Sequence, residues 1–122
     1  MRLDIRGQNF TLTPSLLEHV DRRLRFVLAP FDGRVIRVAV RLGDVNGSHR
    51  GVDKRCRIAV RLRHLGEIVV EATSPDLYAA IDVAAERIGG SVQREVERLR
   101  DGNPIPPRAP RTMRSAARDR LG

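Results

Sequence analysis

The segment VIRVAVRL at residues 35–42 and the segment RCRIAVRLR at residues 55–63 decide the fold. Each alternates apolar residues with arginine or alanine, which is the pattern of a β-strand with one buried side and one side facing water. The residues expected to face the core are Ile36, Val38, Val40 and Leu42 in the first segment and Cys56, Ile58, Val60 and Leu62 in the second.

Two further strands are expected around this pair. Residues 1–6 alternate as well, with Leu3 and Ile5 on the apolar side, and a fourth strand is expected at residues 67–73 after a turn at His64-Leu65-Gly66. Residues 44–53 are expected to form a loop, because they contain the turn residues Asn46-Gly47. Since the last three strands follow each other closely, we expect them to form an antiparallel meander.

Two helices are expected, and each begins at a hydroxyl residue followed by proline. Thr13-Pro14 supplies a cap and a favoured first residue, Pro30 ends that helix, and Ser74-Pro75 starts a longer helix that runs to about Arg100. Gly89-Gly90 interrupts the second helix, which indicates close packing against the sheet rather than a hinge. The apolar stripes are Leu16, Leu17, Val20, Leu24, Val27 and Leu28, and then Leu77, Ile81, Ala84, Ile88, Val92, Val96 and Leu99.

The predicted fold class is α+β. It has two layers in the order β-α-β-β-β-α, with a four-stranded sheet and two helices packed on one face. The other face of the sheet is then open to water. Residues 1–100 are expected to form this domain, and residues 101–122 a disordered Pro/Arg-rich basic tail, because they hold four prolines and five arginines against two aspartates.

The composition favours a polyanionic partner. The net charge is +8, and every basic residue but Lys54 is an arginine, whose planar fork suits phosphate. A GC-rich genome would favour arginine codons too, so arginine use alone leaves both explanations open. The single cysteine excludes an intrachain disulfide, no apolar run reaches about 18 residues, and the N-terminus does not resemble a signal peptide. We therefore expect a cytoplasmic protein with no membrane partner.

Catalytic or metal-binding constellations are not recognisable in the sequence. The possible ligands and nucleophiles are His19, Ser48, His49, Cys56 and His64. None has the close spacing of zinc ligands or the surroundings of a nucleophile elbow. The glycines of residues 43–51 connect two strands, whereas a phosphate loop leads from a strand into a helix and carries a lysine. We expect a non-enzymatic protein with no metal, no cofactor and no small-molecule substrate.

Arginine dominates the predicted open face of the sheet. The residues there are Arg2, Arg6, Arg37, Arg41, Arg55, Arg57, Arg61 and Arg63, opposed mainly by Asp4 and Glu71. Charge on an exposed sheet also improves solubility. The excess of one sign nevertheless favours nucleic acid or ribonucleoprotein binding. Because this face lacks aromatic residues, recognition of folded RNA by shape and phosphate fits better than stacking on splayed bases.

The heptapeptide DLYAAID at residues 76–82 opens the last predicted helix. Together with Ile5-x-Gly7-x-Asn9, the following Leu12-Thr13 and the β-α-β-β-β-α order, it resembles the ribosome hibernation-promoting factor and ribosome-associated translation inhibitor family. That family is also called ribosomal subunit interface protein or sigma-factor modulation protein. The resemblance covers about residues 1–100, and residues 53–58 look like its short-form branch.

The resemblance implies a ribosome hibernation factor. Such a protein binds the small (30S) ribosomal subunit and its rRNA in the mRNA/tRNA channel, inhibits translation in stress or stationary phase, and as a short form is a monomer off the ribosome. The resemblance points to basic residues on the helices, here Arg22, Arg23, Arg87, Arg94, Arg98 and Arg100. The charge pattern adds Arg37, Arg41, Arg57 and Arg61 as secondary candidates. The alternative is a protein–protein regulator, for example of a transcription factor, without direct RNA contact.

Overall fold

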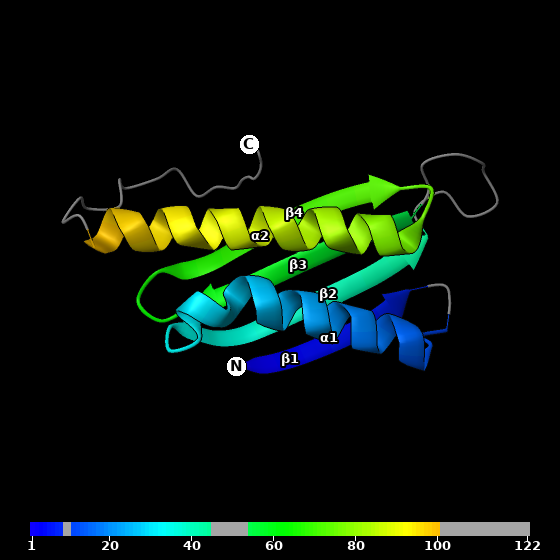
Figure 1. The fold of residues 1–122 in the computed structure, drawn as a ribbon, viewed down its shortest axis with the longest axis horizontal. Coiled ribbons are helices and arrows are strands. Elements are labelled where there is room, and N and C mark those ends of the chain that lie inside the picture. The colour runs from blue at the N-terminus through cyan, green and yellow to red at the C-terminus, as the bar shows by residue number, and fades with distance from the viewer. Residues whose placement is uncertain (9–10, 45–53, 101–122) are drawn as a thin grey trace.

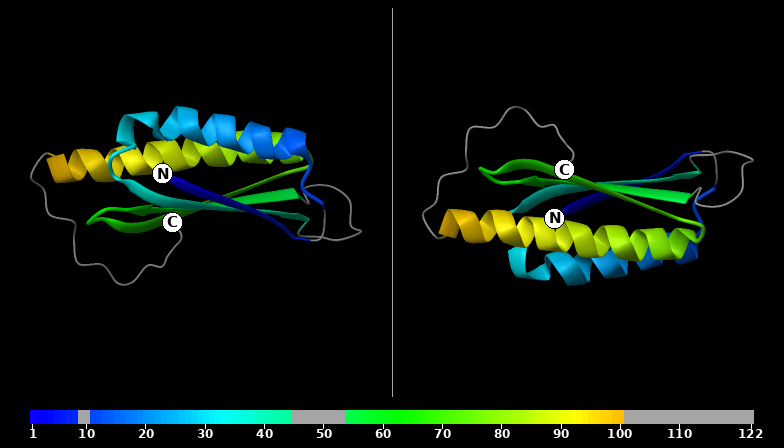
Figure 2. Two further views of the ribbon diagram at one scale, coloured as in Figure 1. Left: turned by 90° about the horizontal axis from the view of Figure 1, so that it is seen from below. Right: turned by 90° about the horizontal axis from the view of Figure 1, so that it is seen from above.

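The computed structural model describes residues 1–8, 11–44 and 54–100, in which one four-stranded sheet carries two helices on one face (Figures 1 and 2). The elements are β1 (Arg2–Gln8), α1 (Pro14–Leu28), the short 3₁₀ helix η1 (Ala29–Phe31), β2 (Val35–Asp44), β3 (Lys54–Leu62), β4 (Gly66–Ser74) and α2 (Leu77–Arg100). The predicted fold class and element order are confirmed. The loop at residues 45–53 and the expected tail at residues 101–122 lie outside the described residues.

The strands lie in the order β1-β2-β3-β4. The pair β1–β2 is parallel, and α1 supplies the crossover that a parallel connection requires. The pairs β2–β3 and β3–β4 are antiparallel, so the predicted meander is confirmed. None of the helices in the described part of the chain has the length and apolarity needed to cross a membrane.

The start of β2 differs from the expected alternation. Val35 faces the core with 4% of its surface exposed, whereas Ile36 is 44% exposed. The register between β2 and β3 shifts between Val35 and Arg37, and one additional residue in a strand reverses the faces of its neighbours. The prediction that Ile36 faces the core was therefore wrong, while Val38, Val40 and Leu42 are buried as expected.

The start of α1 follows the sequence signal, but the start of α2 does not. The Thr13 hydroxyl accepts a hydrogen bond from the backbone N–H of Leu16 at 3.2 Å, so the predicted cap is confirmed. Ser74 instead ends β4, where it pairs with Lys54. The carboxylate of Asp76 accepts from the N–H of Tyr78 at 3.2 Å and caps α2, which begins at Leu77. The cap lies two residues later than expected because the edge strand continues to Ser74.

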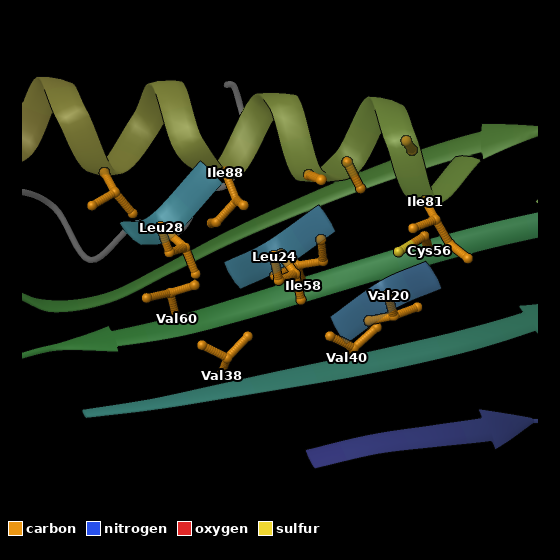
Figure 3. Close-up of a cluster of buried hydrophobic side chains, with 14 of the residues drawn as sticks. Val20, Leu24, Leu28, Val38, Val40, Cys56, Ile58, Val60, Ile81 and Ile88 are labelled. Carbon is orange, nitrogen blue, oxygen red and sulfur yellow. The ribbon is translucent and has the colours of Figure 1, made fainter. Parts of the chain in front are cut away.

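The core is a single apolar layer between the sheet and the helices (Figure 3). From α1 it contains the i, i+4 row of Leu16, Val20, Leu24 and Leu28. Leu17, beside this row, is 38% exposed, and Leu99 is 39% exposed because the last turn of α2 projects beyond the β3–β4 connection (Figure 1). Leu17 and Leu99 were both expected in the apolar stripes. The buried stripe is therefore narrower on α1, and shorter on α2, than the spacing of apolar residues alone predicts.

Gly89 brings α2 close to α1 rather than to the sheet. A Cβ atom built on Gly89 would lie 3.1 Å from the Cβ of Val27, while one on Gly90 would meet only the Arg94 guanidinium at 3.5 Å. The expected close approach is therefore present, but its partner is the other helix. The sequence could not identify this partner, because Val27 and Gly89 are far apart along the chain.

We expect Gly90→Ala to raise the free energy of unfolding by about 0.5–1 kcal/mol, since alanine has the better helix propensity and meets no rigid neighbour. Gly89→Ala is expected to gain less or to destabilise the fold, because its methyl group must displace Val27. Urea unfolding of both variants measures the difference. Equal gains at the two positions would contradict the close helix–helix contact.

Candidate nucleic-acid interface

Three arginines form one row along α2. Arg87, Arg94 and Arg98 are separated by seven and four residues, so they lie on the same side of the helix over about 16 Å. We call them the α2 arginine row. Arg87 Nη1 donates to the backbone oxygen of Glu71 at 2.7 Å, which places the row on the β4 side of the helix. Arg94 Nη2 donates to the Ser91 hydroxyl at 3.2 Å, and Arg98 Nη1 lies 3.9 Å from Glu95.

The opposite side of α2 contacts α1 through an acidic residue. The Asp82 carboxylate lies 2.7 Å from His19 Nε2 and 3.2 Å from Arg23 Nε, so it joins two α1 side chains to α2. The His19 ring meets Tyr78 edge-on, with 5.0 Å between ring centroids. Tyr78 and Asp82 both belong to the heptapeptide at residues 76–82. This motif therefore holds the two helices together.

The six helix arginines do not form one cluster. Arg23 is held by Asp82 between the helices, and its side chain is 30% exposed. Arg22 lies on the outer side of α1, 3.9 Å from Glu18. Arg100 is two residues after Arg98, so it lies on a different side of the last turn of α2. Only Arg87, Arg94 and Arg98 share a row.

The four sheet candidates come together on the open face. Strand register places Arg37 opposite Arg61 and Arg41 opposite Arg57, with Ala39 opposite Ala59 between the two pairs. We call these four residues the arginine cradle. A shallow hollow of about 440 Å³ over the alanines is lined by Asp4, Arg6, Arg37, Ala39, Val40, Arg41, Arg57, Ala59, Glu67 and Val69.

Charge is distributed unequally between the two layers. Helix α2 carries four arginines and four carboxylates. Strand β3 carries four basic residues and no acidic one. The alternation in the sequence identified the arginines of the open face, but it could not show which of them lie opposite each other. Nor could any pattern in the sequence show that Asp82 of α2 pairs with Arg23 of α1.

The histidines, serine and cysteine considered above as metal ligands or nucleophiles do not form a common site in the described part of the chain. Cys56 is fully buried in the core, and within the residues that the structure describes there is no cluster of three or more metal-ligating side chains. Burial raises the pKa of the Cys56 thiol from its ordinary 9.0 to about 12. Ser48, His49 and the glycines Gly47 and Gly51 lie outside the described residues.

We expect Cys56 to resist alkylation by iodoacetamide in the folded protein at pH 8. A pKa of about 12 in place of 9.0 lowers its thiolate fraction there about a thousandfold, and the thiolate is the reactive form. Labelling should accelerate by at least that factor in urea, when the pKa returns to its ordinary value. Mass spectrometry follows the reaction, and rapid labelling of the folded chain would show that Cys56 is accessible.

Comparison with known proteins agrees with this fold. The family model Ribosomal_S30AE, described as sigma 54 modulation protein / S30EA ribosomal protein, matches residues 3–100. The N-terminal domain of Thermus thermophilus Protein Y has a similar structure, with a TM-score of 0.65 and 29% identity over 77% of this chain and 98% of that chain. A ribosomal subunit interface protein from Coxiella burnetii matches with a TM-score of 0.70 and 18% identity, over 80% of this chain and 99% of that one, and this likeness supports the fold alone.

No curated protein sequence matches the chain. The family model nevertheless covers both helices and nearly all of the sheet, including the heptapeptide at residues 76–82 from which the resemblance was inferred. The chain therefore belongs to the Ribosomal_S30AE family, the sigma 54 modulation proteins and S30EA ribosomal proteins.

Proposed function

We propose that this protein binds the small (30S) ribosomal subunit and its rRNA in the channel for mRNA and tRNA, and that it thereby inhibits translation in stressed or stationary-phase cells. The observation that carries the proposal is the family match over residues 3–100. The proposed protein acts in the cytoplasm, without catalysis, and is a monomer away from the ribosome.

The α2 arginine row is the proposed centre of the RNA contact. Its three guanidinium groups lie along about 16 Å of one helix side and can follow a single RNA backbone. In the described part of the chain, Arg94 donates to a neutral hydroxyl, and Arg98 lies 3.9 Å from Glu95, beyond hydrogen-bonding distance. Exchange of these partners for phosphate oxygens therefore costs little.

The other helix arginines have lesser proposed roles. Arg22 and Arg100 are exposed and are proposed to contact phosphates at the margins of the same surface. Arg23 is proposed to contact RNA only while it remains anchored by Asp82, which would position its guanidinium. Phe26, three residues after Arg23 on α1, is 74% exposed and offers no charge to a phosphate.

Sedimentation through sucrose gradients tests the proposal. The protein is expected to move with 30S subunits and to inhibit translation in a reconstituted system. With four to six arginine–phosphate contacts, the log–log dependence of affinity on salt should have a slope of about −3 to −5. A flat salt response would exclude the electrostatic account. Absence of co-sedimentation at low salt would favour the protein–protein regulator instead.

A further inference from the structure

The arginine cradle is a regular array on β2 and β3. The helices cover one face of the sheet (Figure 2), and the cradle lies on the other, because the apolar residues that alternate with it face the core. Within each pair, Arg37–Arg61 and Arg41–Arg57, the residues stand on neighbouring strands about 4.8 Å apart. The two pairs are four residues apart along β2, or about 13 Å. Arginine pairs thus recur along the direction of β2 and β3.

The space between the pairs is open because its floor is alanine. Ala39 and Ala59 are opposite each other and carry only methyl groups, and the hollow of about 440 Å³ lies above them. Any longer side chain at these two positions would fill it. Three of the cradle arginines, Arg37, Arg41 and Arg57, line this recess together with Arg6 of β1, while Arg61 lies outside its lining.

Carboxylates bound the cradle on both flanking strands. On the β1 side, Asp4 lies 4.0 Å from Arg37, and on the β4 side, Glu71 lies 3.3 Å from Arg57. In the described part of the chain, no carboxylate lies within 4.0 Å of Arg41 or Arg61. The register nevertheless sets Glu67 of β4 opposite Arg61, whereas Arg41 stands between Arg6 of β1 and Arg57 of β3. Among the described strands, the excess of positive charge is therefore greatest around Arg41.

We propose that the arginine cradle is a second phosphate-binding surface, which holds one phosphodiester backbone of RNA along β2 and β3. Paired guanidinium groups match the geometry of phosphate oxygens, and Arg2 and Arg6 of β1 continue the array beside Arg37 and Arg41. The four strands contain no aromatic residue, so the contact is with the backbone and is indifferent to base identity.

This inference goes beyond the proposed function, because it does not require the helical surface. The α2 arginine row and the cradle lie on different layers of the domain. A protein with both can contact two RNA segments at once from opposite sides. Solubility alone would be served by evenly mixed charges, whereas four arginines and two carboxylates line the recess.

Fluorescence anisotropy with a labelled 12-nucleotide oligo-U RNA and the full chain tests the cradle. The double variant Arg41→Glu/Arg61→Glu is expected to bind at least about tenfold more weakly, and the salt slope should become shallower by about 1.4 for two lost single-strand contacts. Oligo-A of the same length should bind within about threefold of oligo-U, since no stacking contributes. Arg25→Glu, on the helix layer and outside both the cradle and the α2 arginine row, should retain most of the binding.

A second pair of variants leaves every arginine in place. Ala59→Glu puts a carboxylate into the recess and is expected to weaken RNA binding about as much as the double reversal. Ala59→Gln has nearly the same size without the charge and should bind clearly better than Ala59→Glu. Equal affinities for these two variants would overturn the electrostatic role of the cradle. Circular dichroism establishes that each is folded.

The remaining outcomes also decide between explanations. If oligo-U binding falls with Arg94→Glu/Arg98→Glu and not with the cradle variants, the sheet face is not an RNA surface. Poly-glutamate and inorganic polyphosphate are compared as competitors of labelled oligo-U. If both displace it at the same concentration, the occupant is an acidic protein segment and the RNA assignment is wrong. Co-sedimentation with 30S subunits is measured separately, so failure of the cradle is distinguishable from failure of the proposed function.

Discussion

The variant Arg94→Glu/Arg98→Glu is expected to lose co-sedimentation with 30S subunits at physiological salt, with affinity falling at least about a hundredfold. Each substitution replaces an attraction to phosphate by a repulsion, and like charges brought together at an interface cost several kcal/mol. Within the described residues, the polar partners of both side chains belong to their own helix, namely Ser91 and Glu95. The loss of co-sedimentation therefore reports weaker binding rather than unfolding. Circular dichroism of the variant verifies that it is folded.

Arg87 is less suitable for this measurement, although it belongs to the same row. Its guanidinium donates to the backbone oxygen of Glu71 in β4, at the edge of the sheet. Such a bond covers an otherwise open edge carbonyl, so its removal also affects the strand. An Arg87→Glu variant would mix loss of binding with loss of structure.

The matched comparison is Arg41→Glu/Arg61→Glu, which makes the same change in charge on the open face of the sheet. We expect this variant to lose ribosome affinity by no more than about tenfold, because its contacts are additional to those of the helices. The reverse ranking, with both variants folded, would move the principal ribosome-binding surface to the sheet.

Leu24→Ala is expected to lower the free energy of unfolding by about 3–5 kcal/mol. Leu24 has no exposed surface and lies in the middle of the α1 row that faces the sheet (Figure 3). Its truncation leaves a cavity in a core with few aromatic side chains, where Val, Leu, Ile and Ala supply nearly all the buried volume. For a domain of this size, such a loss is a large part of the total stability.

The control on the same helix is Leu17→Ala. Leu17 is 38% exposed, so its substitution should cost less than about 1 kcal/mol. Urea unfolding monitored by circular dichroism measures both variants. A similar cost at the two positions would mean that the apolar row of α1 is not the one that packs against the sheet.

Features that depend on nearby residues could be predicted from the sequence. The alternation of residues 55–62 identified β3 and its buried side, because the two faces of a strand follow directly from a period of two. The Thr13 cap required only the N–H of Leu16, three residues away. The heptapeptide at residues 76–82, together with the motif at residues 5–13 and the element order, was sufficient to indicate the family. Of the candidate site, the sequence showed which arginines face water on the sheet and which lie on the helices.

Features that depend on contacts between distant residues required the tertiary structure. The register that sets Arg37 opposite Arg61, and Arg41 between Arg6 and Arg57, is a property of three strands together. The exposure of Ile36, the contact of Gly89 with Val27 and the hold of Asp82 on Arg23 likewise join residues that no local pattern relates. Local periodicity determines which side of an element is apolar. Only packing determines which element that side meets and which charges become neighbours.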